Sequence, residues 1–199
     1  MSPAIKRAIR LGVISVLAVI TLATWWFLPG SHTEVDLSAR SDEAMPRSTL
    51  ATVPIYLQTD PKWATEKVGG SGETLQSVGC TICCLSMALA HHGILLDPLE
   101  LNRKLKQGNG YTFRGWVKWD VMKRVSGGRV LVELLKNPSN RDIETALGKG
   151  DPVLVKVLLS SGVQHWVLLV GRDQKDYLMK DPLGDGRSLE PLSILGSHI

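Results

Sequence analysis

The sequence predicts an α+β fold in which packed helices precede a sheet of antiparallel strands. Stretches with helical character fill the middle of the chain, and short, nearly continuous apolar runs separated by turn residues fill its last third. Hydrophobic residues make up 44% of the chain and charged residues 21%, which is the composition of a folded globular protein. Because the helices come first and the strands last, the order favours an α+β domain over a doubly wound parallel sheet.

Three helices are predicted in the first half of this domain. The first covers residues 80–92 and ends at Gly93. The second, residues 97–107, begins with an acid at the N-cap, a proline at the first helical position and Glu100 at the third. The third covers about residues 115–125 and carries two tryptophans.

The remaining elements are mostly strands. A short β-prone run covers residues 53–57, before a glycine-rich loop. The later elements are expected as a strand over 130–135, a helix over 140–149, and strands over 153–159, 165–171 and 177–180.

The N-terminal part of the chain predicts a membrane anchor. Residues 11–28 contain no charge, and as a helix they would rise about 27 Å, roughly the thickness of a hydrocarbon core. The run ends in Trp25, Trp26 and Phe27, which suit a membrane–water interface. This ending favours an uncleaved anchor over a cleaved signal peptide.

The charges around this run predict a topology and a domain organisation. Lys6, Arg7 and Arg10 precede it, so residues 1–10 are expected in the cytoplasm and the rest of the chain outside the cytoplasmic (inner) membrane. Residues 29–52 are polar and are expected to be a linker to one domain, residues 53–199. We expect contact with the membrane and a possible partner in a membrane complex. The net charge of +4 forms no basic stripe, so no nucleic-acid partner is expected.

The three cysteines, Cys80, Cys83 and Cys84, lie within five residues and cannot build a disulfide framework. Cys80 falls where a loop enters a predicted helix, and the unpaired amides and the dipole at such a position favour a thiolate. A thiolate beside a base is a nucleophile. Two alternatives remain: a redox pair of Cys80 with Cys83, and a cysteine that is simply buried.

A histidine and a carboxylate are expected to meet at the end of a hairpin. His165 begins one apolar run and Asp181 follows the next, with a turn at residues 172–175 between them. Folding about this turn pairs His165 with a residue within one position of Asp181. An imidazole beside a carboxylate has a fixed tautomer and a stabilised imidazolium form. The alternative is a lone histidine at a strand end and a solvated Asp-Pro turn.

Several stretches, in this order, resemble the C39-like cysteine peptidase family. They are VPIYLQTDPKW, GGSGETLQSVGCTICCLSMALAHHG, DPLELNRKL, GDPVLVKV, QHWVLLVG and MKDPLGDG, and together they cover about residues 53–187. The resemblance implies a papain-like fold. The better-known members of the family cut leader peptides after a double glycine.

The resemblance also implies a role for individual residues. Cys80 corresponds to the nucleophile, His165 to the general base and acid, and Asp181 to the group that orients the histidine. Gln58, at the end of VPIYLQ, corresponds to the side chain that stabilises the oxyanion together with the Cys80 backbone N–H. Gln76 is the alternative oxyanion donor. No metal and no cofactor are implied.

Two departures from the family concern the substrate. Many relatives have small residues or proline after the cysteine, whereas Thr81 and Ile82 follow it here, and Ile82 could narrow the cleft. Relatives that process leaders are usually fused to a transporter, so their substrate does not carry over. Of the tryptophans, Trp166 is the best candidate to line a peptide groove.

The sequence therefore predicts a membrane-anchored, papain-like cysteine peptidase that hydrolyses peptide bonds in a peptide or protein substrate. Three other functions remain as alternatives. One is a catalytically inactive module that binds a peptide in a membrane complex. The second is a cell-envelope amidase or transpeptidase. The third is a thiol oxidoreductase, which would leave His165 and Asp181 without a role.

Overall fold

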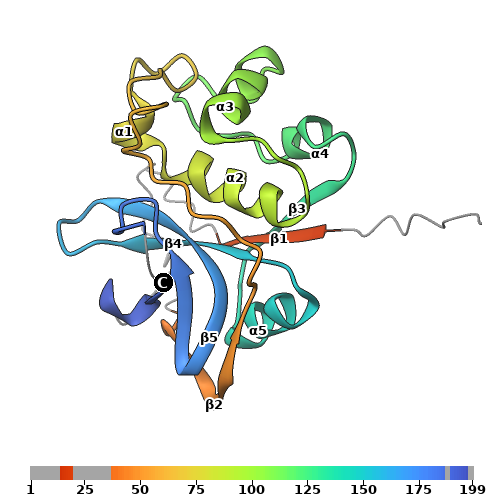
Figure 1. Cartoon of the computed structure of the whole chain (residues 1–199), viewed down its shortest axis with the longest axis vertical. Coiled ribbons are helices and arrows are strands. Elements are labelled where there is room, and N and C mark those ends of the chain that lie inside the picture. Colours follow the sequence, from red (N-terminus) through yellow and green to blue (C-terminus); the bar gives the residue numbers. More distant parts are fainter. Residues whose placement is uncertain (1–13, 20–36, 187–188, 197–199) are drawn as a thin grey trace, which may run out of the picture.

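The computed structural model describes residues 14–19, 37–186 and 189–196 (Figure 1). Its elements follow in this order: β1 (Ile14–Val19), β2 (Arg40–Thr49), α1 (Leu75–Val78), α2 (Cys80–His91), α3 (Pro98–Gln107), α4 (Val121–Val125), β3 (Val130–Leu135), α5 (Asn140–Lys149), β4 (Val153–Leu158), β5 (Gln164–Lys180), β6 (Glu190–Pro191) and the 3-10 helix η1 (Leu192–Ile194).

The described strands form one mixed sheet in the order β2-β5-β4-β1-β3, with β6 beside β5. β5 pairs antiparallel with β2, β4 and β6. β1 pairs parallel with both β3 and β4. The α+β fold and the antiparallel part of the sheet agree with the prediction, whereas the parallel strand pairs were not expected.

Two hydrophobic cores lie on opposite faces of the sheet. Along β4, Leu154 belongs to the core beneath α2 and α3, while Val153 and Val155 belong to the core beneath α5. This alternation is the two-residue period of a strand buried on both faces. Figure 1 shows α1 to α4 on one side of the sheet and α5 on the other.

Local capping signals explain where the longer helices begin. Asp97 accepts a hydrogen bond from the Glu100 backbone N–H at 2.8 Å, and the Glu100 side chain accepts from the Asp97 N–H. Ser139 and Asp142 form the same capping box at the start of α5. Both helices therefore lie where the sequence predicts them.

Two predicted elements differ from the structure. The third helix covers only Val121–Val125, because the residues before it form a hairpin in which Tyr111 bridges to Val117. Gly115 in this hairpin has φ +81°, which a helix does not allow. Residues 53–57 do not form a strand.

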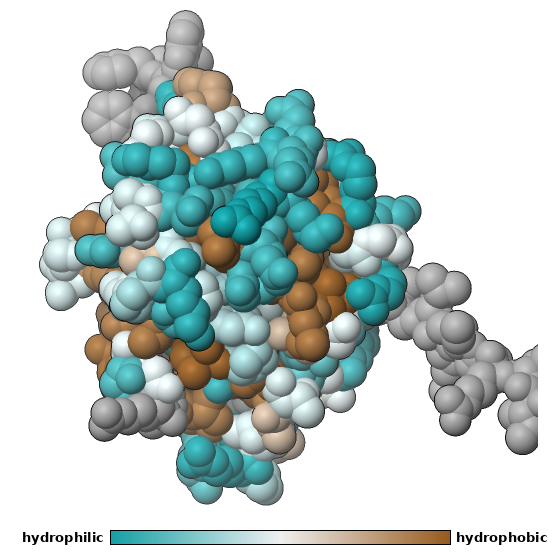
Figure 2. Space-filling view, turned by 45° about the horizontal axis from the view of Figure 1, so that its top comes forward, coloured by the Kyte–Doolittle hydropathy of each residue, from teal (hydrophilic) through white to brown (hydrophobic). Residues whose placement is uncertain are grey.

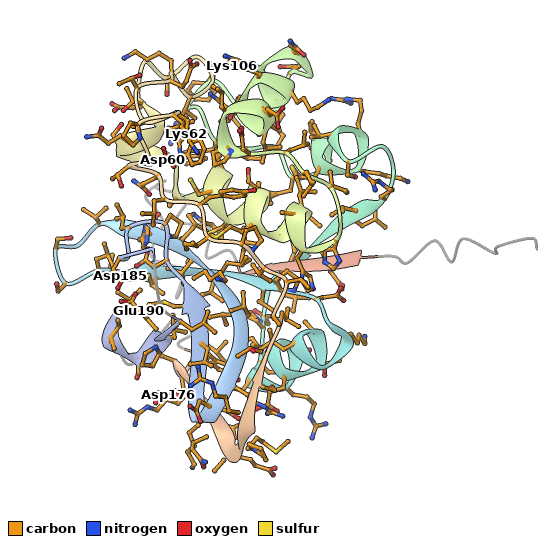
Figure 3. The ribbon with its side chains drawn as sticks, viewed as in Figure 1. Asp60, Lys62, Lys106, Asp176, Asp185 and Glu190 are labelled. Carbon is orange, nitrogen blue, oxygen red and sulfur yellow. The ribbon has the colours of Figure 1, made fainter. Side chains whose placement is uncertain are left out.

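β5 is continuous in its strand hydrogen bonding and yet turns back on itself (Figure 1). Gln174 has φ +54° near its middle, and the side chains of His165 and Asp181 meet at its two ends. In Figure 3, Asp176 lies near the turn of β5. Asp185 follows the C-terminal end of this strand and lies far from the turn. The predicted turn at residues 172–175 therefore brings His165 to Asp181.

Part of the predicted linker, residues 29–52, is instead the edge strand β2. Its side chains are largely exposed, so the sequence has no alternation of apolar and polar residues that would predict this strand. Pairing with β5 and the ion pairs Arg40–Asp176 (2.9 Å) and Arg47–Asp173 (3.1 Å) accompany the strand. At Gly171 a Cβ would lie 2.1 Å from the Ser48 carbonyl oxygen, so the approach of β2 requires glycine there.

Part of the predicted membrane anchor, residues 11–28, also differs from the structure. Ile14–Val19 forms the strand β1 between β3 and β4 instead of a helix. A short apolar run rich in β-branched residues fits a buried strand as well as a helix, and periodicity alone does not separate the two. The rest of the predicted anchor lies outside the described residues. Within the described ranges, no helix is long and apolar enough to span a bilayer.

Candidate active site

Cys80 is the first residue of the 12-residue helix α2 and is partly exposed. Gly79 forms the junction with α1, where its N–H donates to the Leu75 carbonyl at 2.8 Å. A Cβ on Gly79 would lie 2.2 Å from that oxygen, so this tight entry requires glycine. The thiol therefore lies at the positive end of a helix, where the first backbone N–H groups favour an anion.

His165 and Asp181 form a buried pair at the open end of the β5 hairpin. His165 is 3% exposed and Asp181 8% exposed. The His165 Nε2 and Asp181 Oδ1 atoms are 2.6 Å apart, and the Leu183 backbone N–H donates to the same carboxylate oxygen at 2.7 Å. The Cys80 side chain also acts on the His165 ring, where its hydrogen bonding and its charge help to raise the pKa of the histidine. Because Nε2 faces Asp181, Nδ1 is the nitrogen left for the thiol.

The environment of His165 favours its protonated form. Burial lowers its pKa, but hydrogen bonds to Asp181 and Cys80 and the charges of these groups outweigh burial and raise the pKa to about 9. At neutral pH the ring is therefore an imidazolium held between a carboxylate and a thiol.

Gln58 lies beside the chain segment that precedes Cys80. It is 3% exposed, and its Nε2 donates to the Gln76 carbonyl at 2.7 Å. Its backbone N–H donates to the Pro182 carbonyl at 3.0 Å, which ties it to the Asp-Pro turn. The Gln76 side chain, in contrast, is exposed. Between the two predicted oxyanion donors, only the Gln58 side chain is buried against the short helix α1 that precedes Cys80.

The other two cysteines are fully buried in α2. The Cys84 S–H donates to the Trp166 carbonyl at 3.4 Å, so it anchors α2 to β5 next to His165. Burial raises the pKa of both Cys83 and Cys84 well above the ordinary value. A buried thiol with a raised pKa is a poor partner for thiol–disulfide exchange, and the redox alternative gains no support from this geometry.

The two histidines at the end of α2 differ in their hydrogen bonding. His91 uses both ring nitrogens, with Thr52 Oγ1 at 2.6 Å and the Gly150 carbonyl at 2.9 Å. His92 Nε2 is buried without a hydrogen-bond partner, and the Asp151 carboxylate lies 4.0 Å away. Burial and the neighbouring His91 lower the pKa of His92 to about 4. Within the described part of the chain, no group of three or more His, Cys, Asp or Glu side chains is placed to hold a metal ion.

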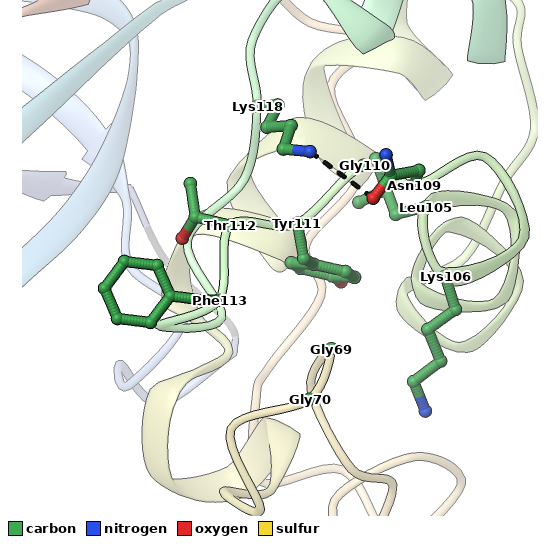
Figure 4. A pocket seen from close by; sticks show the side chains of 10 residues that line it. All are labelled: Gly69, Gly70, Leu105, Lys106, Asn109, Gly110, Tyr111, Thr112, Phe113 and Lys118. Carbon is green, nitrogen blue, oxygen red and sulfur yellow. Dashed lines mark hydrogen bonds between the residues drawn. The ribbon is translucent and has the colours of Figure 1, made fainter.

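A cavity of about 340 Å³ adjoins the site. Its lining includes the neighbours of both Cys80 and His165, together with Trp116, Trp119 and Trp166. Ile82 is 1% exposed and contributes to the wall of this cavity from the core. A larger cavity of about 730 Å³ lies between the 69–70 loop and the end of α3 (Figure 4). Neither of these two cavities is lined by Cys80, His165, Asp181 or Gln58, but only the smaller one is lined by their sequence neighbours.

The family model described as Peptidase C39 family matches residues 74–194 of the chain. This match spans more than half of the chain, and the protein therefore belongs to the peptidase C39 family. Cys80, His165 and Asp181 fall inside the matched range, and Gln58 precedes it. No curated protein and no solved structure matched the chain.

The sequence predicts Cys80, His165, Asp181 and Gln58 as site residues. In the structure His165 contacts Asp181 and interacts with Cys80, and Gln58 is hydrogen-bonded to segments next to Asp181 and just before Cys80. Sequence reasoning missed the bond between Gln58 and Pro182, which joins segments more than a hundred residues apart and has no local sequence signal. It also missed the hairpin that carries Trp116 to the cavity, because the residues around that tryptophan suggested a helix.

Proposed function

We propose that this protein is a cysteine peptidase that cleaves peptide bonds through an acyl-enzyme on Cys80. Membership of the peptidase C39 family supports a peptidase. The observation that carries the catalytic part is the chain of contacts from the Cys80 thiol through the His165 ring to the buried Asp181 carboxylate. Each of these groups has a role in acyl transfer. All three side chains are polar or ionisable, so the packing of apolar side chains does not account for their contacts.

In the first half of the reaction, the Cys80 thiolate attacks the carbonyl carbon of the scissile peptide bond. A C–S bond forms, and the carbonyl π electrons move to oxygen. The backbone N–H of Cys80 and the remaining Nε2 hydrogen of Gln58 stabilise that oxyanion. As the intermediate collapses, the C–N bond breaks and the His165 imidazolium gives its proton to the leaving amine.

In the second half, water hydrolyses the thioester. His165, now neutral, accepts a proton from the attacking water while a second oxyanion forms at the same donors. The C–S bond breaks, the carboxylic acid product leaves, and the thiolate–imidazolium pair is restored. Asp181 remains ionised and keeps the His165 ring in position.

Replacement of the nucleophile tests this proposal. Cys80→Ala should abolish peptide hydrolysis while the thermal unfolding of the chain stays close to that of the wild type, because Cys80 is partly exposed. Cys83→Ala is the matched control on the same helix, and its turnover per folded molecule should persist. Hydrolysis by Cys80→Ala would overturn the proposal. Turnover of peptidoglycan fragments in preference to peptides would favour the envelope amidase instead.

The location of the enzyme is a separate part of the proposal. Lys6, Arg7 and Arg10 before the apolar residues 11–28 support a single-pass anchor with the catalytic domain outside the cytoplasm and in reach of a membrane complex. The strand β1 argues against it, because residues in the sheet cannot also cross a bilayer. Extraction of membranes at alkaline pH tests the anchor: an anchored chain stays in the pellet.

A further inference from the structure

The 340 Å³ cavity is lined by sequence neighbours of the proposed catalytic residues, although none of the four residues lines it directly. Val78 and Thr81 lie within two positions of Cys80, and Gln164 and Trp166 flank His165 on both sides. Because consecutive Cα atoms are about 3.8 Å apart, a substrate side chain that enters this cavity lies within a few residues of the bond that breaks. The cavity is therefore placed to select residues close to the scissile bond.

The walls of the cavity are aromatic and apolar. Trp119 and Trp166 pack with their ring centroids 5.7 Å apart and their planes tilted by 55°. Trp116 comes from the hairpin before α4 and is 60% exposed, which is unusual for so large an apolar side chain. A concave site lined by aromatic side chains gains most from burying another large apolar group.

The hairpin that carries Trp116 is held in place before any substrate arrives. Thr112 N–H donates to the Trp116 carbonyl at 2.8 Å, and the Arg114 guanidinium lies 5.4 Å from the centroid of the Trp116 ring. At Gly115 a Cβ would lie 2.8 Å from the Ser71 Cβ, so the hairpin packs closely on the 68–73 loop. Trp116 is therefore a preorganised wall of the cavity.

Charged side chains of both signs line the cavity, namely Glu73, Arg114 and Lys156, so its charge is mixed while its largest surfaces are the tryptophan rings. A pair of glycines would leave the aromatic walls without contact. In a space-filling view of one face, hydrophilic side chains cover much of the surface and the apolar ones form separate patches (Figure 2).

We propose that this cavity is the specificity site of the enzyme and that it binds a large apolar side chain, aromatic or long aliphatic, within a few residues of the scissile bond of a peptide. This inference rests on the proposed peptidase function and names its substrate class. Trp116, Trp119 and Trp166 are the residues that determine the preference.

Protection of Cys80 from alkylation tests the inference without a known substrate. Blocked pentapeptides Ser-Gly-X-Gly-Ser, with X as Gly, Phe, Trp, Asp or Lys, compete with iodoacetamide, and peptide mass mapping reports the alkylation rate of Cys80. Each protection is expressed relative to the same protein without peptide. Peptides with Phe or Trp should protect at about tenfold lower concentration than the Gly, Asp and Lys peptides.

Two variants make this test specific. Trp116→Ala should reduce the preference for Phe over Gly to within about threefold, since it removes one aromatic wall. Phe113→Ala is the matched control, because Phe113 is 87% exposed on the same hairpin but lines the other cavity (Figure 4). It should keep the wild-type preference.

Equal protection by all five peptides, or a preference that survives Trp116→Ala, would overturn the inference. The proposed function is tested by the alkylation rate of Cys80 without peptide, which the same experiment measures. The proposed function fails if this rate is the same in the wild type and in His165→Ala. The ranking of the peptides is measured in either case, so the two failures are distinguishable.

Discussion

At the scale of single residues, His165 connects Cys80 to Asp181. The carboxylate of Asp181 favours the protonated form of His165. Asp181→Asn removes the negative charge and leaves burial in place, so the pKa of His165 should fall from about 9. We expect the basic limb of the pH–activity profile to move to lower pH and kcat/KM at pH 8 to fall at least about tenfold.

Asp176→Asn is the control for this prediction. Asp176 lies near the turn of the same strand and pairs with the exposed Arg40. It should leave both the basic limb and kcat/KM unchanged. A basic limb that stays in place in Asp181→Asn would mean that the group it reports is not His165.

Gln58 and Gln76 form a second matched pair. Gln58→Ala should lower kcat about a hundredfold, since it removes a donor to the oxyanion. The alkylation rate of Cys80 should not change, because alkylation forms no oxyanion. Gln76→Ala keeps the backbone carbonyl that holds Gln58, so its kcat should stay within about twofold of the wild type. The reverse ranking of the two variants would move the oxyanion role to Gln76.

Three residues of the candidate site, Cys80, His165 and Asp181, could be singled out from the sequence because each one has a local signal. Cys80 begins a helix after a glycine, and His165 and Asp181 flank two apolar runs about a turn. The resemblance to the C39-like family supplied Gln58. The contacts of Gln58 with Gln76 and Pro182 were not predictable, since backbone hydrogen bonds between distant segments leave no pattern in the sequence.

At the scale of elements, prediction succeeded where a side chain determines the local backbone. The capping boxes at Asp97 and Ser139 indicate where α3 and α5 begin. It failed for β2, an edge strand whose largely exposed side chains show no alternation. It also failed for β1, since an apolar run of this composition suits a helix in lipid and a strand in a sheet.

Truncation tests the position of β1. Among the described strands, β3 pairs with β1 alone, so removal of β1 detaches β3 from the sheet and opens the edge of β4. A chain of residues 37–199 should therefore unfold at a Tm at least about 10 °C below that of the full chain, as followed by circular dichroism. An unchanged Tm would contradict the strand and would favour a membrane span over residues 11–28.

At the scale of the whole molecule, two histidines with opposite pKa shifts, the buried His165 and the partly buried His92, give stability a maximum near pH 6.5. The folded pKa of His92 is lowered to about 4, so its contribution is complete above the unfolded value of about 6.5 and is lost as pH falls from there to 4. The folded pKa of His165 is raised to about 9, so its contribution is complete below about 6.5 and is lost as pH rises to 9.

Urea unfolding between pH 4.5 and 9 measures both limbs. His92→Gln should flatten the acid limb and leave the basic limb, because glutamine does not titrate. His165→Ala should flatten the basic limb and leave the acid limb. If His92→Gln keeps the full loss of stability between pH 6.5 and 4.5, carboxylates rather than His92 are responsible for it.

The central claim is that Cys80 and His165 form a thiolate–imidazolium pair. The alkylation rate of Cys80 by iodoacetamide, followed from pH 5 to 10 in the wild type and in His165→Ala, tests it most directly. An unperturbed thiol ionises near pH 8.5, so alkylation in His165→Ala should be slow at pH 6.5. We predict that the wild type reacts at least about tenfold faster than the variant at this pH. Superimposable profiles would contradict the pair and leave a peptide-binding module as the better account.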